Sequence, residues 1–321
     1  MGRLSDFAAW LKAHDDYAIL GHVNPDGDAS GSCIALCLAL QSLGKRAFVY
    51  LPGGIANLYA AFECTVPVAS GSDLPFEPRT GFAVDISELK RMGAGYDIFM
   101  GCESKAMLDH HETNPGFGDV CFIDGEAAAC GELVVELLPE LGVEMNLEMA
   151  TWLYVAICTD CGRFGYSSTR PSTMIAAAEC LRAGINVDRI HQEIYRTRSE
   201  GRTRLLGLAL SGLEMNEEKT LCWARVTEDM RRQANALPED REGIVNYLVE
   251  IQGVQIAFLA EERSANVTKF SLRSKEPYNV ATTICAPLGG GGHACAAGIT
   301  LDLPMEEALE MVLEKARKAL Q

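Results

Sequence analysis

Residues 17–31 read YAILGHVNPDGDASG, an apolar run followed by a loop of polar and small residues. The pattern predicts a buried strand over 17–23 and a helix over 29–43. In open parallel sheets, ligands bind where strands end and helices begin. The stretch therefore indicates an α/β fold and places the histidine and the two aspartates of the loop at its functional edge.

Strand-like and helix-like segments continue to alternate after this stretch. Strands are predicted over 46–51, 81–86, 105–110 and 119–124, and helices over 131–141, 147–160 and 171–183. Such alternation is typical of a mainly parallel sheet with helices on both faces. We therefore expect an N-terminal α/β domain over residues 1–188.

A polar segment leads from this part of the chain to a second alternating unit. Residues 189–204 are rich in arginine and glutamate, and we expect them to form a helical connector. Strands over 221–226, 254–262 and 268–274 follow, and an amphipathic helix over 304–320 closes the chain. The sequence predicts a smaller α/β domain with a mixed sheet over residues 205–321, and an active cleft between the two domains.

Length and composition limit the class of protein. The 321 residues are 48% hydrophobic and 22% charged, which is ordinary for a globular protein of two domains. Charges interrupt the N-terminal segment and no apolar run is long enough to span a membrane, so we expect a cytoplasmic protein without a signal peptide. The 12 cysteines are expected to stay reduced. The net charge of −16 argues against a surface for duplex nucleic acid but is compatible with short nucleotides.

Three residues of the opening loop are candidate metal ligands. His22 precedes Asp26 by four residues, and Asp28 follows two residues later, so the three side chains can converge on bound ions from one loop. The alternative is a polar turn in which an aspartate caps the helix. This motif alone does not separate the two interpretations.

Further candidates end other predicted elements. Asp109, His110 and His111 end a strand, where the chain can bend and bring both imidazoles to one edge. Asp85 ends an apolar strand, where a carboxylate is costly unless it is exposed or bound to metal. Asp160 ends an apolar helix, where it opposes the helix dipole unless a cation lies nearby. The structural alternatives are a polar loop and an ordinary helix end.

Two further motifs contain cysteine or glycine. Cys158 and Cys161 form a CxxC pair, which would suit a redox pair or half a zinc site, but no second CxxC exists in the chain. The run Gly289–Gly292 exposes backbone N–H groups that a phosphate can approach closely, and His293 can donate a hydrogen bond to it. The alternative for the glycine run is a flexible linker.

Together these motifs resemble the DHH phosphoesterase family with its DHH-associated C-terminal domain. The chain is most similar to the NrnA-type branch of nanoRNA hydrolases and pAp phosphatases. The resemblance rests on five motifs in the family's order: HxxxDxD at 22–28, the aspartate at 85, DHH at 109–111, TDCG at 159–162 and GGGGH at 289–293. It covers nearly the whole chain. One departure is Cys161, where the branch usually has threonine.

The resemblance implies that residues 1–188 are the catalytic domain and bind two divalent ions, with manganese preferred and magnesium or cobalt as substitutes. The implied ligands are His22, Asp26 and Asp85 for one ion, and Asp28, Asp85, His110 and Asp160 for the other. His111 would act on the scissile phosphate, and Asp109 would orient an imidazole. The implied substrate-binding residues are Arg273, Ser274, Gly290, Gly291, Gly292 and His293.

The implied function is hydrolysis of short single-stranded oligoribonucleotides (nanoRNA) to mononucleotides, together with conversion of pAp to AMP. Two alternatives remain: hydrolysis of the linear dinucleotides pApA or pGpG, and a sensor that binds nucleotides without cleaving them. The GGGGH run argues against a manganese pyrophosphatase, and the short acidic chain argues against a processive exonuclease such as RecJ. We expect no membrane partner, and a homodimer is compatible with the family.

Overall fold

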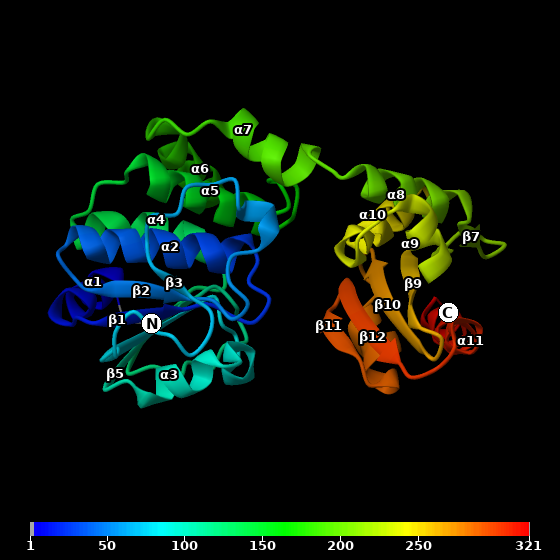
Figure 1. Cartoon of the computed structure of the whole chain (residues 1–321), viewed down its shortest axis with the longest axis horizontal. Coiled ribbons are helices and arrows are strands. Elements are labelled where there is room, and N and C mark those ends of the chain that lie inside the picture. Colours follow the sequence, from blue (N-terminus) through cyan, green and yellow to red (C-terminus); the bar gives the residue numbers. More distant parts are fainter. Residues whose placement is uncertain (1–2, 321) are drawn as a thin grey trace. The chain divides into compact units, whose positions relative to one another are not determined.

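The computed structural model describes residues 3–320, which form two compact units that divide between Thr197 and Arg198 (Figure 1). The division falls inside the segment expected as a connector. That segment is largely helical, because it contains the end of α7 (Val187–His191), a π-helix (Gln192–Arg196) and the start of α8 (Glu200–Ser211). No described helix is long and apolar enough to cross a membrane.

The N-terminal unit has a sheet of six parallel strands. Their order is β3 (Val68–Ala69), β2 (Ala47–Tyr50), β1 (Tyr17–Leu20), β4 (Thr80–Val84), β5 (Ser104–Asp109) and β6 (Val120–Ile123). The predicted parallel sheet is confirmed. Strand β1 pairs with both β2 and β4, so the chain turns in opposite directions at this point. A crevice between the ends of β1 and β4 is where such sheets bind ligands.

Helices cover both faces of this sheet, as the sequence predicts (Figure 1). One face packs beneath α1 (Leu4–Ala13), α2 (Gly27–Ser42), α4 (Cys130–Leu141), α5 (Leu147–Asp160) and α6 (Pro171–Arg182). The other face packs against α3 (Gly95–Gly101) and the 3₁₀ turn η2 (Leu89–Met92), and a further turn, η1, spans Asn57–Tyr59. Helix α2 is apolar on nearly all sides and lies buried between the sheet and its neighbouring helices.

Glycine lets α2 and α5 approach closely. A Cβ atom built on Gly31 would lie 2.3 Å from the carbonyl oxygen of Trp152 in α5. We expect Gly31→Ala to lower the free energy of unfolding by about 1–3 kcal/mol, because the two backbones would have to separate. Urea denaturation of both proteins measures the change.

The matched control is Gly207→Ala in α8, where an added Cβ would meet nothing within 4 Å. Alanine there is expected to raise the free energy of unfolding by about 0.5–1 kcal/mol, because it restricts the unfolded chain in a helical position. A Gly31→Ala protein as stable as the wild type would contradict the close packing of α2 on α5.

The C-terminal unit has a mixed sheet of six strands, as predicted. Their order is β11 (Gly291–His293), β12 (Ala296–Leu301), β10 (Val267–Ser274), β9 (Ile256–Ser264), β8 (Leu221–Val226) and β7 (Glu214–Met215). Among the described strands of this second sheet, only β8 and β9 pair in parallel. The sequence prediction missed the hairpin of β11 and β12.

Helices lie on both faces of this second sheet as well. One face packs against α8, α9 (Glu228–Ala234) and α10 (Ile244–Val249), and the turn η4 spans Pro238–Arg241. The other face packs against α11 (Met305–Ala319) and a π-helix (Ala281–Cys285), which the turn η6 (Ala286–Leu288) follows. The predicted C-terminal amphipathic helix is therefore confirmed as α11.

Candidate metal centre

The carboxyl ends of β1, β4 and β5 bring the predicted ligands of the N-terminal unit to one edge. His22 follows β1, Asp85 follows β4, and His110 follows β5. The Nε2 atom of His22 lies 3.5 Å from Asp85 Oδ2, and the Nε2 atom of His110 lies 3.6 Å from Asp85 Oδ1. The two oxygens of one carboxylate thus face two different imidazoles, which is the arrangement required of a bridging ligand.

The backbone of Asp85 is constrained to make this arrangement. Its φ angle is +58°, in the left-handed region that non-glycine residues seldom adopt. Its N–H donates to the carbonyl oxygen of Leu108 (3.1 Å), and the residue is only 3% exposed. A strained, buried aspartate at a sheet edge is a feature that clusters at functional sites.

Asp26 caps α2 with one carboxylate oxygen and faces His22 with the other. Its Oδ1 atom caps α2 by accepting hydrogen bonds from the N–H groups of Asp28 and Ala29, each at 3.0 Å. Its Oδ2 atom lies 3.6 Å from His22 Nε2. The helix-cap and ligand interpretations are therefore compatible, because they use different oxygens.

Asp28 is tied to a helix more than a hundred residues away. Its oxygens accept hydrogen bonds from the N–H groups of Cys130 (2.7 Å) and Gly131 (2.9 Å), at the start of α4. The hydroxyl of Ser32 donates a third hydrogen bond, at 2.9 Å. The helix terminus stabilises this buried carboxylate, because its N–H groups lack partners within the helix.

Asp160 ends α5, as predicted, and its Oδ2 atom lies 3.4 Å from His110 Nε2. With a side chain 32% exposed, it is more accessible than Asp28 and Asp85. His110 also lies 3.8 Å from Asp28 Oδ2. Three carboxylates therefore surround one imidazole nitrogen.

His111 is oriented by a buried carboxylate. Its Nδ1 atom lies 2.8 Å from Asp109 Oδ1, and Asp109 has no exposed surface. Asn114 donates to the other oxygen of Asp109 and also to the carbonyl oxygen of Ile86 (3.0 Å). No described residue hydrogen-bonds the Nε2 atom of His111. The sequence analysis missed Asn114, whose position in HHETN is typical of a polar loop.

Charge interactions shift the pKa values of the cluster strongly. Burial opposes the charge on His22, but Asp26 and Asp85 outweigh it and raise its pKa to about 10. Burial likewise opposes the charge on His110, and Asp85, Asp28 and Asp160 raise its pKa to about 10.

The pKa values of the carboxylates shift in different directions. Burial, followed by the charges of Asp85 and Asp160, raises the pKa of Asp28 well above its usual value. Burial also raises the pKa of Asp160, to about 6. Burial opposes the charge of Asp85, but hydrogen bonds from His110 and His22 lower its pKa. Excess negative charge in a buried site is what a divalent cation would neutralise.

The donor atoms fit divalent cations. Carboxylate oxygens and imidazole nitrogens suit manganese, magnesium and cobalt. The nitrogen–oxygen separations of 3.4–3.8 Å exceed an ordinary hydrogen bond of about 2.7–3.2 Å. They are close to the spacing of ligand atoms in a four-coordinate site with bonds of roughly 2.0–2.2 Å. Neither Cys158 nor Cys161 is among the ligand groups found in the described residues, so nothing supports a CxxC zinc site.

Without metal, stability is expected to fall as pH rises from about 6.5 to 10. A histidine whose pKa is raised on folding stabilises the fold fully below its unfolded pKa of about 6.5. This stability is lost as pH rises through the folded value of about 10. In the presence of a chelator, we expect the melting temperature to fall by at least roughly 4 °C between pH 6.5 and 9.5. This corresponds to a loss of about 1 kcal/mol in the free energy of unfolding.

Bound manganese should remove this fall, because metal ligation requires neutral imidazoles in the folded state. With manganese, stability should rise up to about pH 6.5 and then change little. Differential scanning calorimetry with and without manganese measures both profiles. Equal slopes in the two conditions would show that His22 and His110 do not bind the ion.

Two of the predicted substrate-binding residues of the C-terminal unit, Arg273 and His293, share one face of its sheet. Arg273 pairs with Ala296, which pairs with His293 across the hairpin, and directly paired residues project to the same side. Ser274 follows Arg273, and its hydroxyl donates to the carbonyl oxygen of Tyr278 (2.6 Å). Arg273 and His293 thus lie in one row of the sheet.

The glycine run has a structural role in the same hairpin. Gly291 and Gly292 belong to the edge strand β11, and Gly292 has a φ of +144°. A Cβ built on Gly290 would lie 2.3 Å from the carbonyl oxygen of Gly298, and one on Gly292 would lie 2.6 Å from Ala297 Cα. The run is therefore an ordered strand edge, which contradicts the linker alternative.

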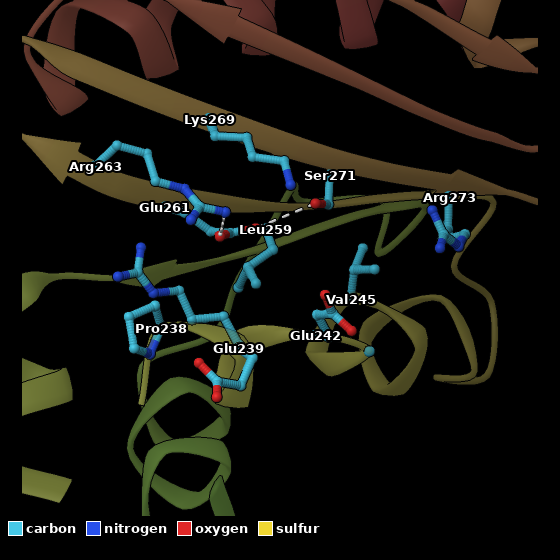
Figure 2. A pocket seen from close by; sticks show the side chains of 12 residues that line it. Pro238, Glu239, Glu242, Val245, Leu259, Glu261, Arg263, Lys269, Ser271 and Arg273 are labelled. Carbon is cyan, nitrogen blue, oxygen red and sulfur yellow. Dashed lines mark hydrogen bonds and ion pairs between the residues drawn. The ribbon is translucent and has the colours of Figure 1, made fainter. Parts of the chain in front are cut away.

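A pocket of about 520 Å³ opens beside Arg273 on this face (Figure 2). Lys269, Ser271 and Arg273 project into it from alternate positions of β10. Glu261 lies at its floor, where it accepts hydrogen bonds from Arg263 (2.7 Å) and Ser271 (3.1 Å). The sequence analysis missed Lys269 and Arg263, although the polar–apolar alternation of TKFSLRS carries the signal for one polar face.

Comparison with known proteins gives two family matches. Residues 16–157 match the DHH family, N-terminal domain, and residues 219–321 match the DHHA1 domain. The chain is 34% identical to the bifunctional oligoribonuclease and PAP phosphatase NrnA of Thermus thermophilus, over 94% of this chain and 89% of that protein. It is 23% identical to the Bacillus subtilis protein of the same name, over 91% of each.

Solved structures agree with these matches. An exopolyphosphatase-related protein from Bacteroides fragilis superposes with a TM-score of 0.90 at 27% identity, covering 98% of this chain and 95% of the other. The exonuclease RecJ bound to manganese superposes with a TM-score of 0.56 at 16% identity, covering 99% of this chain and 95% of the other. At that identity, the RecJ likeness concerns the fold alone.

Proposed function

The chain belongs to the DHH phosphoesterase family, with a C-terminal DHHA1 domain, and is a hydrolase; from this premise we propose that it hydrolyses short oligoribonucleotides to mononucleotides and pAp to AMP. The observation that carries the proposal is the position of the Asp85 carboxylate between two histidines. One of its oxygens lies 3.5 Å from His22 Nε2, and the other lies 3.6 Å from His110 Nε2. A site of this kind suits phosphoester hydrolysis assisted by two ions.

We assign the ligands in two groups that share Asp85, with manganese as the preferred ion. The groups are His22, Asp26 and Asp85, and Asp28, Asp85, His110 and Asp160. When bound, the ions would lower the pKa of an attacking water and stabilise negative charge on the phosphoryl oxygens. The N–H groups at the start of α4 would hold Asp28 in place while it binds the ion.

His111 has a separate role in this mechanism. Asp109 accepts a hydrogen bond from His111 Nδ1, which fixes the tautomer and the direction of the ring. In a protonated His111, the Nε2–H would donate to the scissile phosphate or give its proton to the leaving oxygen. Asn114 would hold Asp109 in turn, through its second oxygen.

We assign substrate binding in the C-terminal unit to Arg273, Ser274, Gly290, Gly291, Gly292 and His293. Support comes from the row that Arg273 and His293 form across the sheet, and from the pocket beside Arg273, into which Lys269 also projects. A pocket of about 520 Å³ has the size of a small-ligand site. Arginine and lysine side chains there would pair with substrate phosphates.

A substrate panel tests the function. Purified protein with manganese is given a dinucleotide, a five-mer, pAp, pApA, pGpG and pyrophosphate, and an Asp85→Asn protein purified in parallel reports contaminating nucleases. We expect turnover of the dinucleotide, the five-mer and pAp, and none of pyrophosphate. Binding of nucleotides without turnover of any of them would refute the enzyme proposal in favour of a sensor.

A further inference from the structure

The first residue of α4, Cys130, places a sulfur atom among the proposed metal ligands. Cys130 has no exposed surface, and its Sγ atom lies 3.9 Å from Asp85 Oδ1 and 3.8 Å from Asp109 Oδ1. One ligand atom from each of Asp28, Asp85, His110 and Cys130 lies within 4.8 Å of all the others. The motifs of the sequence did not single out this cysteine.

Three of the six separations within this group are close to the edges of a tetrahedral site. His110 Nε2 lies 3.6 Å from Asp85 Oδ1 and 3.8 Å from Asp28 Oδ2, and Cys130 Sγ lies 3.9 Å from Asp85 Oδ1. Four-coordinate zinc, with bonds of roughly 2.0–2.3 Å, has neighbouring ligand atoms about 3.3–3.7 Å apart. These three separations are therefore within a few tenths of an ångström of ligand spacing, and the other three pairs lie within 4.8 Å.

Asp28, Asp85 and His110 also belong to the ligand set proposed for turnover. In that set the fourth ligand is Asp160, which supplies a carboxylate oxygen instead of a sulfur. The two sets differ in one donor: a carboxylate oxygen from the end of α5, or a thiol sulfur from the start of α4. Oxygen donors favour manganese and magnesium, whereas sulfur favours zinc and other thiophilic ions. The donor that completes the set would decide which ion the position prefers.

We propose that Cys130 is a sulfur ligand at this position when a thiophilic divalent ion binds, in a set completed by Asp28, Asp85 and His110. The inference rests on the proposed function for the location of the ion, but its test requires no turnover. As the metal–sulfur bond forms, the S–H bond breaks and the proton passes to solvent. A closed set of four protein ligands leaves no position for water, so zinc in this set would support less hydrolysis than manganese.

Cobalt reports sulfur ligation directly. Metal-free protein is titrated with Co²⁺, and the near-ultraviolet band from charge transfer between sulfur and cobalt is recorded. We expect a band that saturates with bound Co²⁺ in the wild type and is absent from Cys130→Ser. The matched control is Cys37→Ser, at another fully buried cysteine whose sulfur is outside the ligand group; its band should be unchanged.

A competition measurement gives the size of the effect and checks folding. The preference for Zn²⁺ over Mn²⁺ should fall at least roughly 10–100-fold in Cys130→Ser, since even outer groups of metal sites contribute this much. Its Mn²⁺ affinity should be retained, because that set uses Asp160, and retention also shows that the variant folds. No near-ultraviolet band in the wild type, or a band that persists in Cys130→Ser, would overturn the proposal while leaving the phosphoesterase proposal intact. A sulfur–cobalt band in a protein that turns over no substrate would support Cys130 as a ligand and refute the phosphoesterase proposal.

Discussion

Asparagine in place of Asp85 is expected to lower kcat at least roughly a thousandfold, the upper end of what one electrostatic contact contributes. Asparagine keeps the volume and one oxygen, so it fills the buried site without a cavity. It removes the charge and presents an N–H group where the second imidazole now faces an oxygen. Both proposed ion positions lose a ligand, because each oxygen of Asp85 faces a different histidine.

Arg273→Ala provides the comparison for Asp85→Asn. Removing Arg273 takes away a proposed substrate contact and leaves the ligand cluster intact, so KM should rise while metal affinity stays the same. Asp97→Asn, an exposed carboxylate in α3, controls for a general change of charge. Calorimetric titration with Mn²⁺ alongside steady-state kinetics separates the three variants. Similar residual rates for Asp85→Asn and Arg273→Ala would refute a bridging role for Asp85.

Replacement of His111 by glutamine is expected to have the second largest effect, a fall in kcat of about 10²–10⁴-fold, as for loss of a general acid. The free Nε2 atom would no longer carry a proton to the leaving oxygen. Affinity for Mn²⁺ should be unchanged, because His111 is not among the six proposed ligands. Single-turnover kinetics at saturating substrate measures the chemical step.

Asp109→Asn tests the orientation of the same ring. An amide at position 109 would present an N–H group to either His111 Nδ1 or Asn114, both of which now face carboxylate oxygens. We expect kcat to fall, because the ring would lose the carboxylate that holds its direction and tautomer. Glu112→Gln, at an exposed neighbouring position, is the control. Loss of Mn²⁺ affinity in His111→Gln would instead make His111 a ligand.

The sequence predicts the parts of the fold that depend on local patterns. Strands β1 and β4 are buried throughout and mostly apolar, and a polar ligand candidate follows each of them, His22 after β1 and Asp85 after β4. The hairpin strand β12 escapes prediction because ACAAGIT contains small residues where a buried strand usually has large ones. Its pairing with β10 supplies the missing signal, and only the folded chain contains it.

The site divides in the same way. The proposed ligands lie in loops and at helix ends, where their residue types carry the chemistry, so each can be identified along the chain. Other features depend on contacts that single motifs do not encode. They are the positive φ of Asp85, the hydrogen bond from Asn114 to Asp109, and the position of the Cys130 sulfur beside Asp85. The basic row on β10 lies between these cases: its alternation is visible in the sequence, but its pocket requires η4 and α10 to close around it.

The contact between Asp28 and α4 has a consequence for the order of assembly. During synthesis, five of the six proposed ligands leave the ribosome before Cys130 and Gly131. They are His22, Asp26, Asp28, Asp85 and His110. Until those two amides arrive, Asp28 has no helix terminus to hold it. We expect the ion that Asp28 binds to load only after α4 docks, so metal uptake would be a late event in folding. Hydrogen exchange followed at the Cys130 and Gly131 amides should show protection that appears before Mn²⁺ is retained.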